Sequence, residues 1–161
     1  MDEASITQHI VNTFDGVETV TMPGATFFFY GSDHMLPFAT LVTNDDFDKA
    51  SDLNRPGVFR LNIGIGKQAF LSLFGSKPPR PGASGTPDYP AGAYDFTALD
   101  RLMPHPDYGH LSWVCILNPS DTTFQEAVQP LLTEAYELAV RRINTRAAHA
   151  GRNEVRVMRN A

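Results

Sequence analysis

Short segments rich in β-branched and aromatic residues lie between two segments that have the apolar period of a helix. The β-rich segments cover 17–21, 25–30, 38–43, 58–63 and 111–117, and a short helical segment covers 67–74. The flanking helical segments cover 5–14 and about 120–145. This order predicts an α+β fold, in which a small antiparallel sheet is covered on one face by an N-terminal and a long C-terminal helix. The other face of the sheet is left open.

Three stretches break these regular patterns. Residues 75–93 hold five of the twelve prolines, so we expect a long loop that packs partly through Tyr89 and forms a mobile lid. Residues 96–103 favour a helical turn or a short helix. Pro130 lies within the long C-terminal helix, where it is expected to kink the helix or delay its regular start.

Length and cysteine content bound the class of protein. With 161 residues the chain has the size of one domain, which we place at 1–145, followed by a flexible basic tail at 146–161. The single cysteine, Cys115, excludes an internal disulfide framework. No apolar run reaches the roughly 18 residues of a membrane helix, and the start Met1-Asp2-Glu3 is acidic. We therefore expect a cytoplasmic protein without membrane association.

The net charge of −5 hides an asymmetry along the chain. Residues 1–140 carry a net charge of −10, whereas residues 141–161 contain six arginines and one glutamate and carry +5. The body of the protein would repel nucleic acid, and only the tail would attract it. Alternatively, these arginines are solvated and complement the dipole at the end of a helix.

The densest polar and aromatic cluster is MPHPDYGH at 103–110, which leads to Trp113. His105 and Asp107 have the residue types of an acid/base pair in which the carboxylate fixes the imidazole tautomer, and they are our catalytic candidates. Together with His110 they also have the residue types of a metal site, but their spacing is too short, and we predict no metal and no cofactor. The alternative is a turn that closes one end of the sheet.

Arg60 and Asn62 lie on the face of their strand opposite Phe59 and Leu61. Such a pair suits a carboxylate or phosphate, although an exposed antiparallel face would also accommodate it. The candidate ligand-binding residues are Arg60, Asn62, Tyr108, His110 and Trp113.

Three other groups of residues favour a structural role. Asp45, Asp46, Asp48 and Asp52 lack the pattern of a calcium loop and are interpreted as solvated turn residues. Gly64 and Gly66 do not fit a phosphate-binding loop. Cys115 is expected to be buried and inert within its strand.

Several of these segments resemble a family known as domain of unknown function 6194, which is associated with actinobacteria. The resemblance is carried by TFFFY at 26–30, PFATLVT at 37–43, DLNRPGVFRLN at 52–62, MPHPDYG at 103–109 and WVCILNP at 113–119. The family usually has Trp-Gly-Asp before the aromatic strand, where this chain has Pro23-Gly24-Ala25. More loosely, the layout resembles the MmcQ/YjbR superfamily, which implies an α+β fold that is sometimes described as DNA-binding. Neither resemblance implies a particular activity.

Three functions follow as hypotheses. The first is an uncharacterised small-molecule-binding domain with its pocket on the open face of the sheet. The second is an enzyme of specialised metabolism that uses His105 and Asp107 as acid and base. The third is a DNA-binding protein that acts through the basic tail. The sequence favours the first, with a small-molecule ligand as the expected partner.

Overall fold

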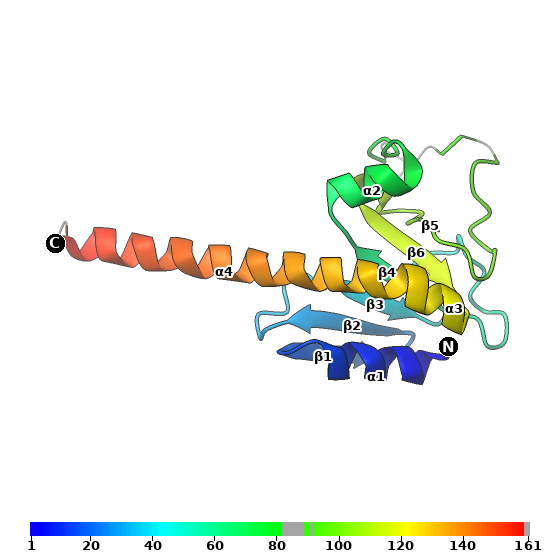
Figure 1. The fold of residues 1–161 in the computed structure, drawn as a ribbon, viewed down its shortest axis with the longest axis horizontal. Coiled ribbons are helices and arrows are strands. Elements are labelled where there is room, and N and C mark those ends of the chain that lie inside the picture. Colours follow the sequence, from blue (N-terminus) through cyan, green and yellow to red (C-terminus); the bar gives the residue numbers. More distant parts are fainter. Residues whose placement is uncertain (82–88, 91, 160–161) are drawn as a thin grey trace.

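The computed structural model describes residues 1–81, 89–90 and 92–159. Its centre is an antiparallel sheet of six strands in the order β1-β2-β3-β4-β6-β5 (Figure 1). The strands are β1 Val17–Met22, β2 Ala25–Tyr30, β3 Ala39–Val42, β4 Arg60–Gly64, β5 Met103–Pro104 and β6 Trp113–Leu117. The helices are α1 Glu3–Thr13, α2 Lys67–Phe74, α3 Asp121–Thr123 and α4 Gln129–Arg159.

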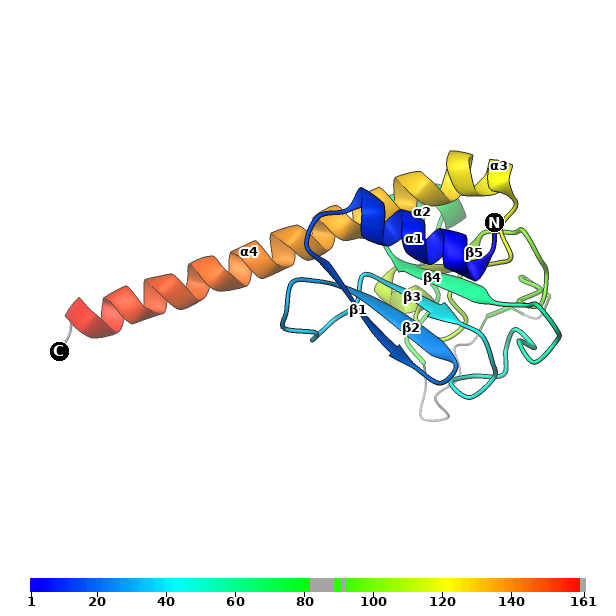
Figure 2. The same ribbon diagram turned by 90° about the horizontal axis from the view of Figure 1, so that it is seen from below.

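Helices α1 and α4 cover one face of this sheet, and Figure 2 shows both on the same side of the strands. The core between these layers contains Ile6 and Ile10 of α1, Leu132 and Ala135 of α4, and Leu61 of β4. Burial of such aliphatic side chains is the main force that holds a helix against a sheet. The predicted α+β fold is therefore confirmed, including the sheet face that carries no helix.

The segment after the Pro/Gly-rich loop differs from the prediction. Residues 96–103 form no helix. The N–H of Ala98 donates to the Asp95 carbonyl at 3.1 Å in a single turn, and from Leu99 the chain runs alongside β6 instead. Leu99 makes an isolated bridge to Leu117, and the N–H of Asp100 donates to the Leu117 carbonyl at 2.7 Å. The chain then enters β5, which pairs with β6. These contacts with a distant strand outweigh the weak local preference for a helical turn.

The start of the C-terminal helix is irregular, as Pro130 predicts. After α3, a π-helical turn spans Phe124–Val128, and the N–H of Gln129 donates to the carbonyl of Phe124. Pro130 has no N–H, and its ring would collide with the carbonyl four residues earlier in a regular helix. The wider π-turn relieves this conflict, so regular α-helix begins only at Gln129.

The end of α4 lies further along the chain than predicted. The helix continues beyond 145 to Arg159, and every residue from 144 to 159 is exposed. Figure 1 shows this part as a straight helix that projects away from the sheet. The expected end near 145 was wrong, because the helix persists beyond its last buried residue, Ala139. The division into a domain at 1–145 and a flexible tail remains a proposal.

Candidate functional site

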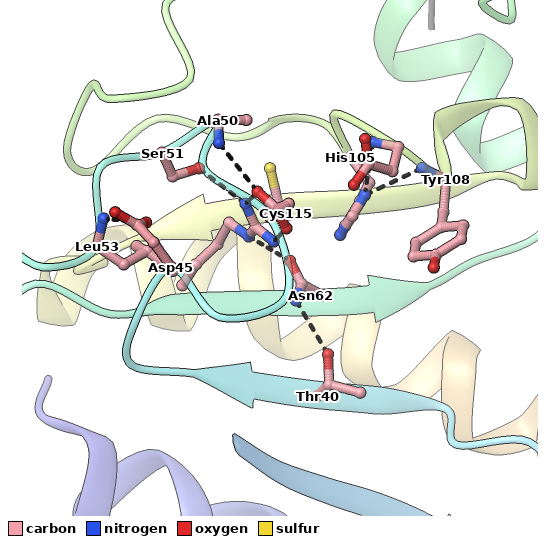
Figure 3. Close-up of polar contacts among 12 residues, drawn as sticks. Thr40, Asp45, Ala50, Ser51, Leu53, Asn62, His105, Tyr108 and Cys115 are labelled. Carbon is pink, nitrogen blue, oxygen red and sulfur yellow. Dashed lines mark hydrogen bonds and ion pairs between the residues drawn. The ribbon is translucent and has the colours of Figure 1, made fainter. Parts of the chain in front are cut away.

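The open face of the sheet carries an unusual row of side chains. The strand register places Thr40 opposite Asn62, and Asn62 opposite Cys115. Two residues earlier along β4, Arg60 lies opposite Val42 and Leu117. The predicted alternation along β4 is confirmed, since Leu61 lies in the core on the helix-covered face. Figure 3 shows Thr40, Asn62 and Cys115 on neighbouring strands.

Arg60 is buried and makes its hydrogen bonds within the protein. Its side chain is 1% exposed. Its Nε donates to Asn62 Oδ1 at 2.9 Å, Nη1 to Asp48 Oδ1 at 3.0 Å and Ser51 Oγ at 2.9 Å, and Nη2 to Asp48 Oδ2 at 2.6 Å. The alternative of an exposed strand face was therefore wrong. Arg60 lines the cavity described below, but its charge is already paired, so it offers an anionic ligand little attraction.

Asp48 supplies the charge that Arg60 needs. It comes from the loop between β3 and β4, where its Oδ1 also accepts the N–H of Ala50 at 3.1 Å. Burial acts to raise the pKa of Asp48, but the hydrogen bonds and charge of Arg60 outweigh it and lower that pKa. The interpretation of Asp48 as a solvated turn residue was wrong. The available signal was Arg60 itself, since an arginine on a strand of the sheet needs a nearby carboxylate when it is buried.

Asn62 links this ion pair to the middle of the sheet. Its Oδ1 accepts from Arg60, and its Nδ2 donates to Thr40 Oγ1 at 3.0 Å. These contacts fix the orientation of the amide, because an oxygen must face the guanidinium and a nitrogen must face the hydroxyl acceptor. The Thr40 hydroxyl hydrogen is left to donate elsewhere.

His105 is held by the backbone around it. Its Nδ1 accepts the N–H groups of Asp107 and Tyr108, each at 3.0 Å, as Figure 3 shows for Tyr108. The backbone N–H of His105 donates to the Trp113 carbonyl at 2.9 Å, and the backbone carbonyl of His105 accepts the Tyr89 hydroxyl at 2.8 Å. With both neighbours donating to Nδ1, the proton of the neutral ring lies on Nε2.

Burial, and secondly the charge of Arg60, lower the pKa of His105 to about 3. The ring is therefore neutral at physiological pH and presents an Nε2–H donor. We predicted that the Asp107 carboxylate fixes the tautomer of His105. This was wrong, because backbone N–H groups fix it instead. The catalytic role of His105 and Asp107 stays a prediction.

These groups meet at a cavity of about 330 Å³ on the open face. Its described lining comprises Phe27, Leu36, Pro37, Thr40, Val42, Phe47, Asp48, Arg60, Asn62, His105, Asp107, Tyr108, Leu111 and Trp113. Four of the five predicted ligand-binding residues are among them, as are both catalytic candidates. His110 is not, and its Nδ1 is buried without a hydrogen-bond partner among the described residues.

Asp107 differs from the other charged groups of the cavity. Its backbone N–H is used by His105, but within the described part of the chain its carboxylate accepts no hydrogen bond. Burial, and secondly the charge of Asp48, raise the pKa of Asp107, and the charge of Arg60 opposes them only in part. Among the described residues, an ionised Asp107 therefore has no cation paired with it.

The loop before the site is only partly described. Tyr89 packs edge to face with Tyr94 and Phe96, with ring centroids 5.7 and 5.3 Å apart, so the predicted packing through Tyr89 is confirmed. Of the predicted lid, 75–93, residues 82–88 and 91 lie outside the described residues.

Cys115 is buried beside the site, and burial raises the pKa of its thiol to about 12. Its Sγ lies 3.6 Å from the Pro104 carbonyl. A thiol with so high a pKa is not a nucleophile at neutral pH, as predicted. Among the described residues, no group of three or more His, Cys, Asp or Glu side chains is placed to hold a metal ion.

Two larger hollows lie elsewhere on the described surface. One, of about 690 Å³, lies between α1 and the β1–β2 hairpin, and Glu3 is the only charged residue of its described lining. The other follows the projecting part of α4. Both are open to solvent, and neither brings buried polar groups together, so the cavity on the sheet is the better candidate.

The comparisons with known proteins identify a family but no activity. The model of a family of unknown function, DUF6194, matches residues 1–148. No curated protein and no solved structure matches the chain. None of the described helices combines the length and the apolar character that crossing a membrane requires.

Proposed function

Because the chain belongs to DUF6194, a family of unknown function, we propose its function from the cavity itself: the protein binds a small organic molecule on the open face of the sheet. The observation that carries this proposal is the convergence of buried polar groups with apolar walls. Asn62, Thr40 and His105 lie at the polar side, whereas Phe27 and Trp113 contribute aromatic surface. Ligand sites commonly combine a mostly apolar lining with a few fixed polar groups.

The cost of the polar network supports this proposal. A buried ion pair stabilises a fold little more than well-packed apolar residues do, because both charges lose their hydration. Asp48 and Arg60 nevertheless lie beside the cavity, with Asn62 and Ser51 completing their hydrogen bonds. A role in ligand binding therefore explains the buried Asp48–Arg60 pair better than a contribution to stability does.

Ligand-observed NMR with a panel of charged and uncharged single-ring compounds tests the proposal. Leu111 is an exposed residue at the edge of the cavity, and a larger side chain there would narrow the entrance. We expect Leu111→Trp to weaken binding about tenfold, or 1.4 kcal/mol. Leu73→Trp is the matched control, since Leu73 is also exposed but lies on α2, outside the cavity lining. Absence of any binding, or equal binding by Leu111→Trp, would refute the proposal.

If the site is catalytic, His105 would act as a neutral donor rather than as a general base. Its Nδ1 is occupied by two backbone N–H groups, and its lowered pKa disfavours the imidazolium. The Nε2–H would then donate to an oxygen of the substrate, while Asp107 would exchange the proton. Loss of turnover in a folded His105→Ala variant would support this second hypothesis.

One observation favours nucleic-acid binding as another candidate. At 100° per residue, the six arginines from Arg141 to Arg159 and His149 fall within an arc of about 140° on α4. The exposed part, 144–159, extends about 24 Å at 1.5 Å per residue, which is beyond the Debye length of about 8 Å at physiological salt. The acidic body would therefore repel a polyanion at its tip only weakly.

Deletion of 146–161 tests this candidate. It should abolish binding to duplex DNA and the dependence of that binding on salt. Equal binding by the deleted and the full chain would exclude it. We also propose a cytoplasmic location and an actinobacterial association for this protein. Its looser resemblance to the MmcQ/YjbR superfamily is likewise a proposal.

A further inference from the structure

The described lining of the cavity holds two carboxylates, Asp48 and Asp107, but only one permanent cation, Arg60. Asp48 and Arg60 neutralise each other through two hydrogen bonds, at 2.6 and 3.0 Å. His105 is fixed as a neutral Nε2–H tautomer by the backbone. Of the Asp and Arg side chains in the described lining, only Asp107 is left without an ion pair or a hydrogen bond among the described residues. A ligand therefore meets a site whose net charge is negative when Asp107 is ionised.

The walls of the cavity suit a positive charge as well. Four aromatic side chains line it: Phe27, Phe47, Tyr108 and Trp113. They come from four separate segments, and the rings of Phe27 and Phe47 meet edge to face with their centroids 6.3 Å apart. The faces of aromatic rings carry partial negative charge and attract cations at short range. Bound organic ammonium groups are commonly surrounded by aromatic side chains. The described lining of this cavity offers such side chains, and its one permanent cation, Arg60, is already paired.

We propose that the ligand of this cavity is an organic cation, with a single ammonium-type head near Asp107 and an apolar or aromatic body against the four rings. This inference rests on the proposed small-molecule function. It replaces the expectation that Arg60 would select a carboxylate or phosphate, because Asp48 has already taken that charge. An anionic ligand would meet the uncompensated Asp107 instead.

Three probes of one size separate the possibilities: benzylammonium, benzyl alcohol and benzoate. Trp113 is the only tryptophan of the chain and lines the cavity, so its fluorescence reports on occupation of the site. At neutral pH we expect benzylammonium to bind about tenfold more tightly than benzyl alcohol, which is the gain expected for a cation beside a partly buried carboxylate and aromatic faces. Benzoate should bind more weakly than both.

Asp107→Asn tests the role of the carboxylate. The substitution keeps the shape of the side chain and leaves the backbone N–H that serves His105 in place. We expect benzylammonium to lose its tenfold advantage, while binding of benzyl alcohol stays unchanged. Asp15→Asn is the matched control, because Asp15 is exposed and lies outside the cavity lining, so the same loss of charge there should leave the advantage intact.

A pH series gives a second readout that needs no substitution. The advantage of benzylammonium should disappear as the pH falls through the pKa of Asp107, which lies above the ordinary value of 3.8. Equal binding of benzylammonium and benzyl alcohol, or strongest binding of benzoate, would overturn the inference but leave the small-molecule function standing. An advantage that survives in Asp107→Asn would also overturn it. Failure of all three probes to bind would instead overturn the proposed function itself.

Discussion

The carboxylate of Asp48 accepts two hydrogen bonds from the guanidinium of Arg60, at 2.6 and 3.0 Å. Asp48 lies in the loop between β3 and β4, whereas Arg60 begins β4. The pair therefore fastens this loop onto the open face of the sheet. Ser51 of the same loop adds a third contact to Arg60, at 2.9 Å. One wall of the cavity depends on this attachment.

Removal of Asp48 should strongly destabilise the fold. Asp48→Ala leaves a guanidinium that is 1% exposed without its counter-charge, and we expect a loss of about 3–5 kcal/mol in the free energy of unfolding. Urea denaturation measures this loss. Arg146→Ala is the control, because its ion pair with Asp33 at 3.1 Å is exposed and should contribute less than about 1 kcal/mol. Equal effects of the two substitutions would show that the Asp48–Arg60 pair is not sequestered.

Stability should depend on pH through His105. Its pKa is about 3 in the folded protein and near 6.5 when unfolded, so the unfolded state takes up the proton first. The contribution of His105 to stability is therefore fully present above pH 6.5 and is lost as the pH falls from 6.5 towards 3. His105→Asn should remove this part of the pH dependence while keeping an acceptor for the N–H groups of Asp107 and Tyr108. Urea denaturation at a series of pH values measures it.

His105→Gln is the matched control for that acceptor. Its amide lies one carbon further from the backbone, where it cannot replace Nδ1, so the partly buried N–H groups of Asp107 and Tyr108 would lose their partner. We expect it to cost about 2 kcal/mol more than His105→Asn. Identical pH profiles for the wild type and His105→Asn would contradict the neutral, buried ring.

A side chain at Gly64 should disturb the wall formed by Trp113. A Cβ atom at this position would lie 3.0 Å from both Cε2 and Cζ2 of Trp113, so the indole would have to move. Such overpacking typically costs about 1–3 kcal/mol. Gly64→Ala should therefore shift the emission of Trp113 and weaken ligand binding. Gly66→Ala is the control, because the nearest atom to a Cβ there is 3.6 Å away, in the side chain of Glu134. Unchanged emission in Gly64→Ala would place Trp113 elsewhere.

Truncation after Ala148 should leave the domain intact. All described residues beyond this point are exposed, and the match to DUF6194 also ends at 148. Because no buried side chain is removed, the free energy of unfolding should change by less than about 0.5 kcal/mol. A matched truncation after Gln129 removes the buried Leu132, Ala135 and Ala139 and should prevent folding. A large loss of stability on truncation after Ala148 would contradict the proposed division of the chain.

The regular parts of the fold were predictable from local pattern. The apolar periods of α1 and α2, the alternation along β4 and the effect of Pro130 each follow from geometry within one segment. The predictions for 96–103 and for the end of α4 were wrong because neither feature depends on the local period of apolar residues. The first depends on contacts with β6, such as the hydrogen bond from the Asp100 N–H to the Leu117 carbonyl. The second is a helix that persists without burial.

Part of the site was predictable, although His110 was predicted wrongly as a member and Asp48, Thr40, Phe27 and Phe47 were missed. Arg60, Asn62, His105, Asp107, Tyr108 and Trp113 all line the cavity, because strand alternation and a stiff Pro-containing turn locate them. The sequence could not reveal that Asp48 pairs with Arg60 or that backbone N–H groups bind His105 Nδ1. Both contacts depend on how irregular loops return to the sheet, and no periodic pattern encodes that return.

The central claim is that the open face of the sheet binds a small organic molecule. Amide chemical-shift mapping with benzyl alcohol and with benzylammonium tests it most directly. The amides of Asp107 and Tyr108 donate to His105 Nδ1, and those of Thr40 and Asn62 lie on the cavity floor. We predict that these four amides shift in a saturable manner, while those of the projecting part of α4, 144–159, do not. Shifts confined to the groove between α1 and the β1–β2 hairpin, or no saturable shifts at all, would contradict the account.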